Sequence, residues 1–156
     1  MKEEIRYLSL CGLLGYVYAP ESLANALAEP LDFIGVDAGS TDPGPYYLGS
    51  GKGFVKRLQV KRDLALALPE ALSRKIPLII GSAGGAGARP HVDATLEVLQ
   101  EIAAEKKLRF TVAVVYSDLD VGQLRQWAAQ GRLTPCGGAP EFDPACLDQL
   151  AHPVAQ

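Results

Sequence analysis

Two glycine-rich stretches of the chain hold most of the side chains that could do chemistry. Residues 37–53 and 81–87 contain nine of the sixteen glycines, and each stretch directly follows a short apolar run. Glycine-rich turns that follow strands can expose backbone N–H groups, which bind phosphate or carboxylate groups. We therefore expect an anion-binding site at these stretches, although the glycines would also serve to make tight turns.

The first stretch combines carboxylates with hydroxyl groups. Asp37 and Asp42 are candidate catalytic acids or bases, and Ser40 and Thr41 between them are candidate ligand-binding residues. Asp118 follows a later apolar run in the same way that Asp37 follows an earlier one, so it is also a candidate ligand-binding residue. The two strand-end carboxylates could bind hydroxyl groups or Mg²⁺, and Asp118 could instead cap a helix.

The second stretch leads into a helix that we expect to begin near Pro90, whose N-terminus would add partial positive charge. Its candidate ligand-binding residues are Gly81, Ser82, Gly84, Gly85 and Arg89. His91, in the first helical turn, could act as a general acid or base at the same place, or could be an ordinary surface histidine. The glycine spacing departs from G-x-G-x-x-G, which argues against a dinucleotide site.

Five lysine or arginine side chains lie within residues 52–62 of a chain that is acidic overall. Two of them, Lys61 and Arg62, are candidate ligands for an anion, and a solvated helix face is the alternative. Residues 49–53 imitate a phosphate loop, but glycine follows Lys52 where serine or threonine is required. The nucleoside-triphosphate motif is therefore absent.

Composition restricts the class of protein. The 156 residues carry 15 Lys and Arg against 18 Asp and Glu, a net charge of −3, which argues against general binding of nucleic acid. The three cysteines are odd in number and form no C-x-x-C motif, which indicates a reducing, cytoplasmic setting. The two histidines are too few for a histidine-based transition-metal site. No apolar run is long enough to span a membrane, and the glycines of the N-terminal apolar run argue against a signal peptide. Nothing in the sequence assigns a cofactor.

Short apolar runs alternate with segments of helical period, which predicts parallel strands joined by helices. Strands are expected at residues 5–10, 31–36, 76–80 and 110–116, and helices at 20–27, 54–75, from 90 onward and at 121–130. The prediction is an α/β domain over residues 1–131: a small Rossmann-like or flavodoxin-like three-layer fold with a mainly parallel sheet of about four strands. Residues 132–156 form a Pro/Gly-rich tail with a short helix, which could begin a truncated second region.

The carboxyl ends of parallel strands share one edge of the sheet, where ligands bind in open α/β folds. We therefore expect Asp37, Gly84 and Asp118 to lie at one common rim and to face a small anionic molecule. This geometric expectation underlies every candidate site residue.

Three motifs resemble the acyclic terpene utilisation (AtuA-like) family: VDAGSTDPGPYYLG at residues 36–49, VKRDL at 60–64 and IIGSAGGAGARPH at 79–91. Members of that family are several hundred residues long, so the resemblance is to their N-terminal portion only. It implies a cytoplasmic protein in the catabolism of acyclic terpenes or branched carboxylic acids, which are commonly handled as coenzyme A thioesters. A thioester would suit an anion-binding rim, because coenzyme A carries phosphates.

Three functions remain open from the sequence. The first is the N-terminal part of a catabolic enzyme that binds an anionic substrate. The second is a non-catalytic binding or assembly module that needs a partner, either another copy of the chain or a separate C-terminal subunit. The third, a nucleotide-binding domain, is disfavoured because both glycine signatures depart from the known motifs.

Overall fold

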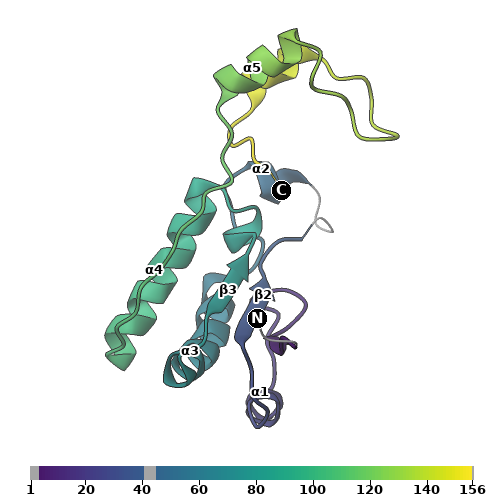
Figure 1. The fold of residues 1–156 in the computed structure, drawn as a ribbon. Coiled ribbons are helices and arrows are strands. Elements are labelled where there is room, and N and C mark those ends of the chain that lie inside the picture. Colours follow the sequence, from purple (N-terminus) through teal and green to yellow (C-terminus); the bar gives the residue numbers. More distant parts are fainter. Residues whose placement is uncertain (1–3, 41–44, 156) are drawn as a thin grey trace.

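The fold is a small parallel sheet with helices packed against it (Figure 1). The computed structural model describes residues 4–40 and 45–155. Its elements in chain order are β1 (Tyr7–Ser9), α1 (Pro20–Ala26), β2 (Phe33–Asp37), α2 (Pro45–Gly49), α3 (Arg57–Arg74), β3 (Leu78–Gly81), η1 (Ala83–Gly85), α4 (Arg89–Lys106), α5 (Val121–Ala129) and η2 (Pro144–Gln149).

The three strands lie in the order β1-β2-β3 and are all parallel. Leu8 lies opposite Ile34, and Ile34 lies opposite Leu78, so the apolar residues of the three strands share one face. Each connection between neighbouring strands contains a helix, as parallel pairing requires. The predicted α/β class with an open parallel sheet is confirmed.

The expected fourth strand does not form. Residues 110–116 belong to no helix and to no strand, so the described part of the chain has three strands rather than about four. Leu108 N–H donates to the Ala103 carbonyl at one end of this segment, and Ser117 N–H donates to the Gly87 carbonyl at the other. The apolar, β-branched composition favours a strand, but pairing also requires the segment to lie within hydrogen-bonding distance of β3.

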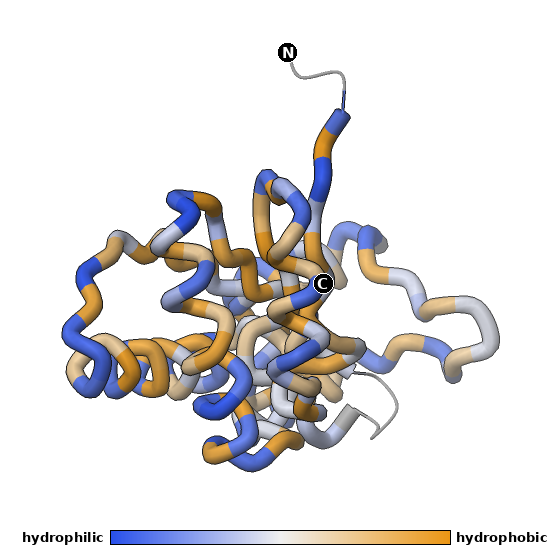
Figure 2. Tube along the Cα trace, turned by 90° about the horizontal axis from the view of Figure 1, so that it is seen from below, coloured by the Kyte–Doolittle hydropathy of each residue, from blue (hydrophilic) through white to orange (hydrophobic). Residues whose placement is uncertain are grey.

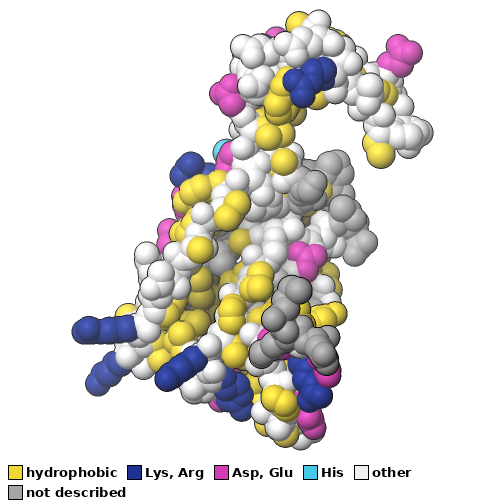
Figure 3. All heavy atoms as spheres, in the orientation of Figure 1, with side chains coloured by type: hydrophobic (Ala, Val, Ile, Leu, Met, Phe, Trp, Pro, Cys, Tyr) yellow, Lys and Arg dark blue, Asp and Glu magenta, His cyan; other side chains and the backbone are white. Residues whose placement is uncertain are grey.

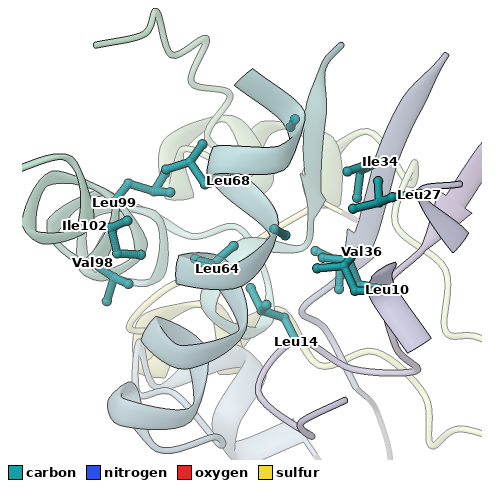
Figure 4. Packing of buried hydrophobic residues seen from close by; sticks show 13 residues of the cluster. Leu10, Leu14, Leu27, Ile34, Val36, Leu64, Leu68, Val98, Leu99 and Ile102 are labelled. Atoms are coloured by element: carbon teal, nitrogen blue, oxygen red, sulfur yellow. The ribbon is translucent and has the colours of Figure 1, made fainter. Parts of the chain in front are cut away.

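A single hydrophobic core lies between the sheet and the helices (Figure 4). Leu64 of α3 is fully buried between the strand residues Ile34 and Val36 and the α4 residue Ile102. Leu23 of α1 joins the same cluster, so the three main helices share one face of the sheet. The expected third layer is not seen in residues 4–40 and 45–155.

The opposite face of the sheet is exposed. Tyr7 of β1 is 63% exposed and Ile79 of β3 is 52% exposed, which is the period-two alternation of strands that are buried on one side. Tyr7 stacks on Phe33 of the neighbouring strand, with ring centroids 5.2 Å apart. This stacked pair shields part of an otherwise open face.

The helices begin and end at residues typical of helix termini. Prolines lie in the first turns of α1 and α4, where a missing N–H costs nothing, and α3 and α4 end at Lys75 and Lys107 in the left-handed conformation. Figure 2 shows orange and blue alternating along the helical turns, as expected for helices with one buried side. Among the helices that the structure describes, none combines the length and the hydropathy needed to cross a membrane.

Helix α5 packs with the tail rather than with the sheet (Figure 1). Leu124 of α5 and Leu147 of η2 are both buried, and Arg125 donates to Asp148 at 2.6 Å. The chain then returns to the rim, where Leu119 N–H donates to the Pro153 carbonyl. Helix α5, in the expected 1–131 domain, thus contacts η2 in the Pro/Gly-rich tail.

Ion pairs between α3 and α4 predict an acid-dependent contribution to stability. Arg57 donates two hydrogen bonds to Glu101, at 2.9 and 2.6 Å, and Lys61 lies 3.2 Å from the same carboxylate. The hydrogen bonds from Arg57, which have the largest effect, and from Lys61 lower the pKa of Glu101 to about 2. An unfolded glutamate titrates near 4.3, so the stabilisation is complete above that pH and is lost as the pH falls towards 2.

We therefore expect Glu101→Gln to lower the melting temperature slightly at neutral pH, because the carboxylate is exposed and screened by solvent. The difference between the two proteins should narrow steadily as the pH is lowered from 5 to 2, and also in 1 M salt. Thermal unfolding followed by circular dichroism across this pH range tests it. A difference that stays constant at all pH values would contradict the prediction.

Candidate functional site

The loops that follow the three strands meet at one rim of the sheet. Leu14 N–H, after β1, donates to the Asp37 carbonyl at the end of β2, and Ala38 N–H donates to the Gly81 carbonyl at the end of β3. At Gly39 an added Cβ would lie only 2.6 Å from Ser82 Cβ, so the second and third loops are in close contact. The loops after β2 and β3, which were expected to meet, therefore lie together, and the loop after β1 joins them.

A pocket of about 210 Å³ opens between these loops, α3 and the start of α4. Its lining is mostly apolar. The apolar lining residues are Leu13, Leu14, Ala38, Tyr47, Leu48, Phe54, Val55, Val60, Pro90, Ala94 and Val98. The polar lining residues are Ser40, Arg57, His91 and Thr95.

His91 and Thr95 are the buried polar residues of the pocket lining, and Thr95 Oγ1 donates to the His91 carbonyl. His91 is 1% exposed, and its Nε2 lies 3.1 Å from the Lys52 carbonyl oxygen. A carbonyl can only accept, so Nε2 carries the hydrogen and Nδ1 is left as an acceptor. Nδ1 is the buried side-chain atom without a hydrogen-bond partner among the described residues. Buried polar atoms are rarely unpaired in folded proteins, and such an atom is a candidate for contact with a ligand.

The N-terminus of α4 is already capped by the protein itself. Asp118 Oδ2 accepts from Arg89 N–H at 2.8 Å, and Asp120, rather than Asp118, caps α5. The Arg89 guanidinium stacks on the Tyr116 ring at 4.1 Å. Because a carboxylate of the chain occupies the first amide of the helix, a bound phosphate would not find that amide free.

The predicted site residues fall into four groups. Ser40, Gly84, Gly85 and His91 line the pocket. Asp37, Gly81, Ser82, Arg89 and Asp118 lie at the rim but not in the pocket lining. Lys61 and Arg62 lie on α3. Thr41 and Asp42 lie outside the residues that the structure describes.

The two basic candidates are engaged elsewhere. Lys61 pairs with Glu101 and Glu105 of α4, on the outer surface of the helix pair, so the solvated-face alternative describes its position. Arg62 donates to the buried Asp63 at 2.8 Å and lies over the Tyr18 ring. Neither side chain belongs to the pocket lining.

Asp63 holds the first loop in place, a role not apparent from the sequence. Its carboxylate is fully buried and accepts from Gly15 N–H at 2.9 Å and from Val17 N–H at 3.2 Å. Burial, followed by the negative charge of Asp63, raises the pKa of Cys11 and of Tyr18. Cys11 is therefore a protonated thiol that donates to the Leu13 carbonyl, and not an activated nucleophile.

Sequence reasoning missed the apolar character of the pocket. Leu13 and Leu14 come from the loop after β1, where no site residue was predicted, and Phe54 and Val55 come from the approach to α3. Gly15, with φ +95°, allows that loop to turn back against α3. Gly12 and Gly15, directly after the first strand, were the available signal for a third loop at the rim.

In the described part of the chain, no three His, Cys, Asp or Glu side chains gather in a way that could hold a metal ion. The oxygen ligands at the strand ends are engaged in other bonds: Asp37 Oδ1 accepts from Gly39 N–H, and Asp118 caps α4. Comparison of the chain with protein-family models, with curated proteins and with solved structures finds no match.

Proposed function

We propose that the chain binds a small branched acyl compound, as a carboxylate or a coenzyme A thioester, in the rim pocket. The observation that carries the proposal is a buried, unpartnered His91 Nδ1 in the lining of a mostly apolar pocket. Together with the resemblance to the AtuA-like family, it favours a role as the N-terminal part of an enzyme of acyclic terpene or branched carboxylate catabolism.

The size of the pocket limits the ligand. Pockets for drug-sized molecules commonly enclose about 300–1,000 Å³, and this one encloses about 210 Å³. A short branched aliphatic group suits a pocket of this size and lining. Burial of each methylene in such a lining contributes about 0.8 kcal/mol to binding.

The charged part of the ligand would remain at the mouth of the pocket. Arg57, the one cation among the lining residues, is already paired with Glu101, so the interior offers little attraction to a negative group. Lys52 is adjacent, since its carbonyl holds His91 and its Nζ lies 3.1 Å from the Tyr46 hydroxyl at the exposed surface. Lys52 is therefore the cation best placed to meet a carboxylate or a phosphate at the mouth.

A thermal-shift series tests this proposal, with 3-methylbutanoyl-CoA, acetyl-CoA, free CoA and 3-methylbutanoate as probes. A ligand at about 100 times its dissociation constant should add about 2.7 kcal/mol to the free energy of unfolding. We expect the branched thioester to give the largest shift and free CoA the smallest. No shift with either branched compound would overturn the proposal.

Substitution of His91 separates binding from folding. His91→Gln keeps an N–H that can donate to the Lys52 carbonyl but removes the ring acceptor, so we expect near-normal stability and a loss of affinity of about tenfold or more, which is about 1.4 kcal/mol. His91→Ala removes both functions and should also lower the melting temperature. Isothermal titration with the branched thioester provides the readout. Unchanged affinity in His91→Gln would contradict a direct contact.

An assembly role is a second candidate function, favoured by the unpaired edge of β3. Ala94→Phe, which would fill the pocket from an exposed position, distinguishes the two roles. It should abolish ligand binding and leave association with any partner chain intact.

A further inference from the structure

The outer edge of β3 is unpaired. In the sheet order β1-β2-β3, this strand is bonded on one side to β2, and no described residue bonds to its other side. An open edge of this kind presents a row of free N–H and C=O groups that can pair with another strand.

A second unpaired strand-like segment faces this edge. Residues 110–116 return from the far end of α4 to the rim, in the same direction as β3. Leu108 and Ser117 on either side of them are hydrogen-bonded to the rest of the chain, and Tyr116 at the end of the segment donates from its hydroxyl to Asp93. The five residues 111–115 are all exposed, and Val115 is 84% exposed. We call residues 110–116 the exposed segment.

A groove of about 670 Å³ separates the exposed segment from β3. Its floor is apolar and includes Leu68 and Leu72 of α3 and Leu96 and Leu99 of α4. Figure 3 shows hydrophobic side chains gathered on this side of the molecule between α4 and β3. Directly paired strands lie about 4.8 Å apart and leave no such space, so the groove has the position and the lining of a missing strand.

We propose that the exposed segment of a second copy of the chain fills this groove, and that the exchange is reciprocal. Each exposed segment would then lie between β3 of the other copy and the exposed segment of the other copy. The order of strands becomes β1-β2-β3, the two exposed segments, and β3-β2-β1 of the second copy. The two-fold axis passes between the two antiparallel segments, so the contact is the same on both copies and closes as a dimer.

The composition of the exposed segment favours a second copy over closure within one chain. The exposed segment has no charged residue, proline or glycine at positions 111–115. Charged residues and proline are features that protect the edge strands of monomers from pairing with other chains. Closure of the segment onto its own β3 would leave its outer edge unpaired. Exchange pairs both of its edges and covers the grooves of both copies at once.

The test combines native mass spectrometry of the full chain with hydrogen exchange at low and high protein concentration. We expect a dimer whose population rises with concentration, and protection of the amides of residues 111–115 that rises with it. Val114→Lys places a charge on the 39% exposed Val114 and should raise the dimer dissociation constant by about tenfold or more, with unchanged circular dichroism. Ile5→Lys, at a residue that is 67% exposed and outside the groove, is the matched control and should leave dimerisation unchanged.

Three results would overturn the proposal. A chain that stays monomeric with protected amides at 111–115 would show closure within one chain. A monomer with rapidly exchanging amides there would show that the groove stays open. A dimer that resists Val114→Lys, or that forms without protecting these amides, would place the interface elsewhere. None of these outcomes depends on ligand binding at the rim pocket.

Discussion

Replacement of Asp63 by alanine is expected to lower the free energy of unfolding by about 3 kcal/mol or more. The carboxylate is fully buried and accepts from Gly15 N–H, Val17 N–H and the Arg62 guanidinium. Alanine leaves the two backbone donors without acceptors and removes the anion that pairs with the Arg62 guanidinium. Urea denaturation of the two proteins measures the loss.

The structure offers a matched control for this substitution. Asp148 pairs with Arg125 at 2.6 Å, a distance close to the 2.8 Å between Asp63 and Arg62, but both members of this pair are exposed. Exposed ion pairs contribute about 0–1 kcal/mol, so Asp148→Ala should have a small effect. Equal losses in the two variants would show that the burial of Asp63 and its backbone bonds do not determine the stability of the first loop.

Gly84→Ala is expected to lower the free energy of unfolding by about 2–4 kcal/mol and to abolish ligand binding in the rim pocket. Gly84 has φ +70°, where a side chain is strained. An added Cβ would lie 2.5 Å from the His91 carbonyl oxygen and 2.7 Å from His91 Cβ. Relief of this overlap requires the first turn of α4 to move, and His91 moves with it.

Gly12→Ala is the control for Gly84→Ala. Gly12 also lies in a loop that follows a strand, but no atom lies within 4 Å of an added Cβ and its φ is outside the left-handed region. Its effect should be within about 0.5 kcal/mol, measured by urea denaturation under the same conditions. Wild-type stability and normal thioester affinity in Gly84→Ala would show that the η1 turn adapts without displacing His91.

Local sequence patterns predicted most of the secondary structure. The continuous apolar run at 76–80 and the run at 31–36 correspond closely to β3 and β2, and Pro20 marks the first residue of α1. These elements could be predicted because strands and helices place their buried side chains with periods of 2 and 3.6 residues. The same patterns indicate a parallel sheet, since helices separate the strands.

Residues 110–116 show the limit of such patterns. Their composition is that of a strand, yet the structure leaves them unpaired beside the groove. Pairing depends on where the end of α4 delivers the chain and on what occupies the space next to β3. Neither quantity is encoded in the local composition of the segment.

The candidate site also contains residues whose position could be predicted from the sequence and residues whose partners could not. The position of Gly84, Gly85 and His91 at the rim could be predicted, because turns after strands lie at the rim of a parallel sheet. Lys61 and Arg62 could not be assigned, because their sequence spacing says nothing of the carboxylates on α4 or of the buried Asp63. The same limit applies to Asp118, whose partner is the first amide of α4.

The order of elements, the parallel class of the sheet and the gathering of the strand-end loops at one rim were therefore determined by the sequence itself, because they follow from local periodicity and chain connectivity. Only the tertiary structure decided that the pocket is apolar, that His91 is buried with one nitrogen unpartnered, and that β3 keeps an open edge. The physical reason is that burial and pairing depend on contacts between residues far apart in the chain, such as Lys52 with His91 and Gly15 with Asp63.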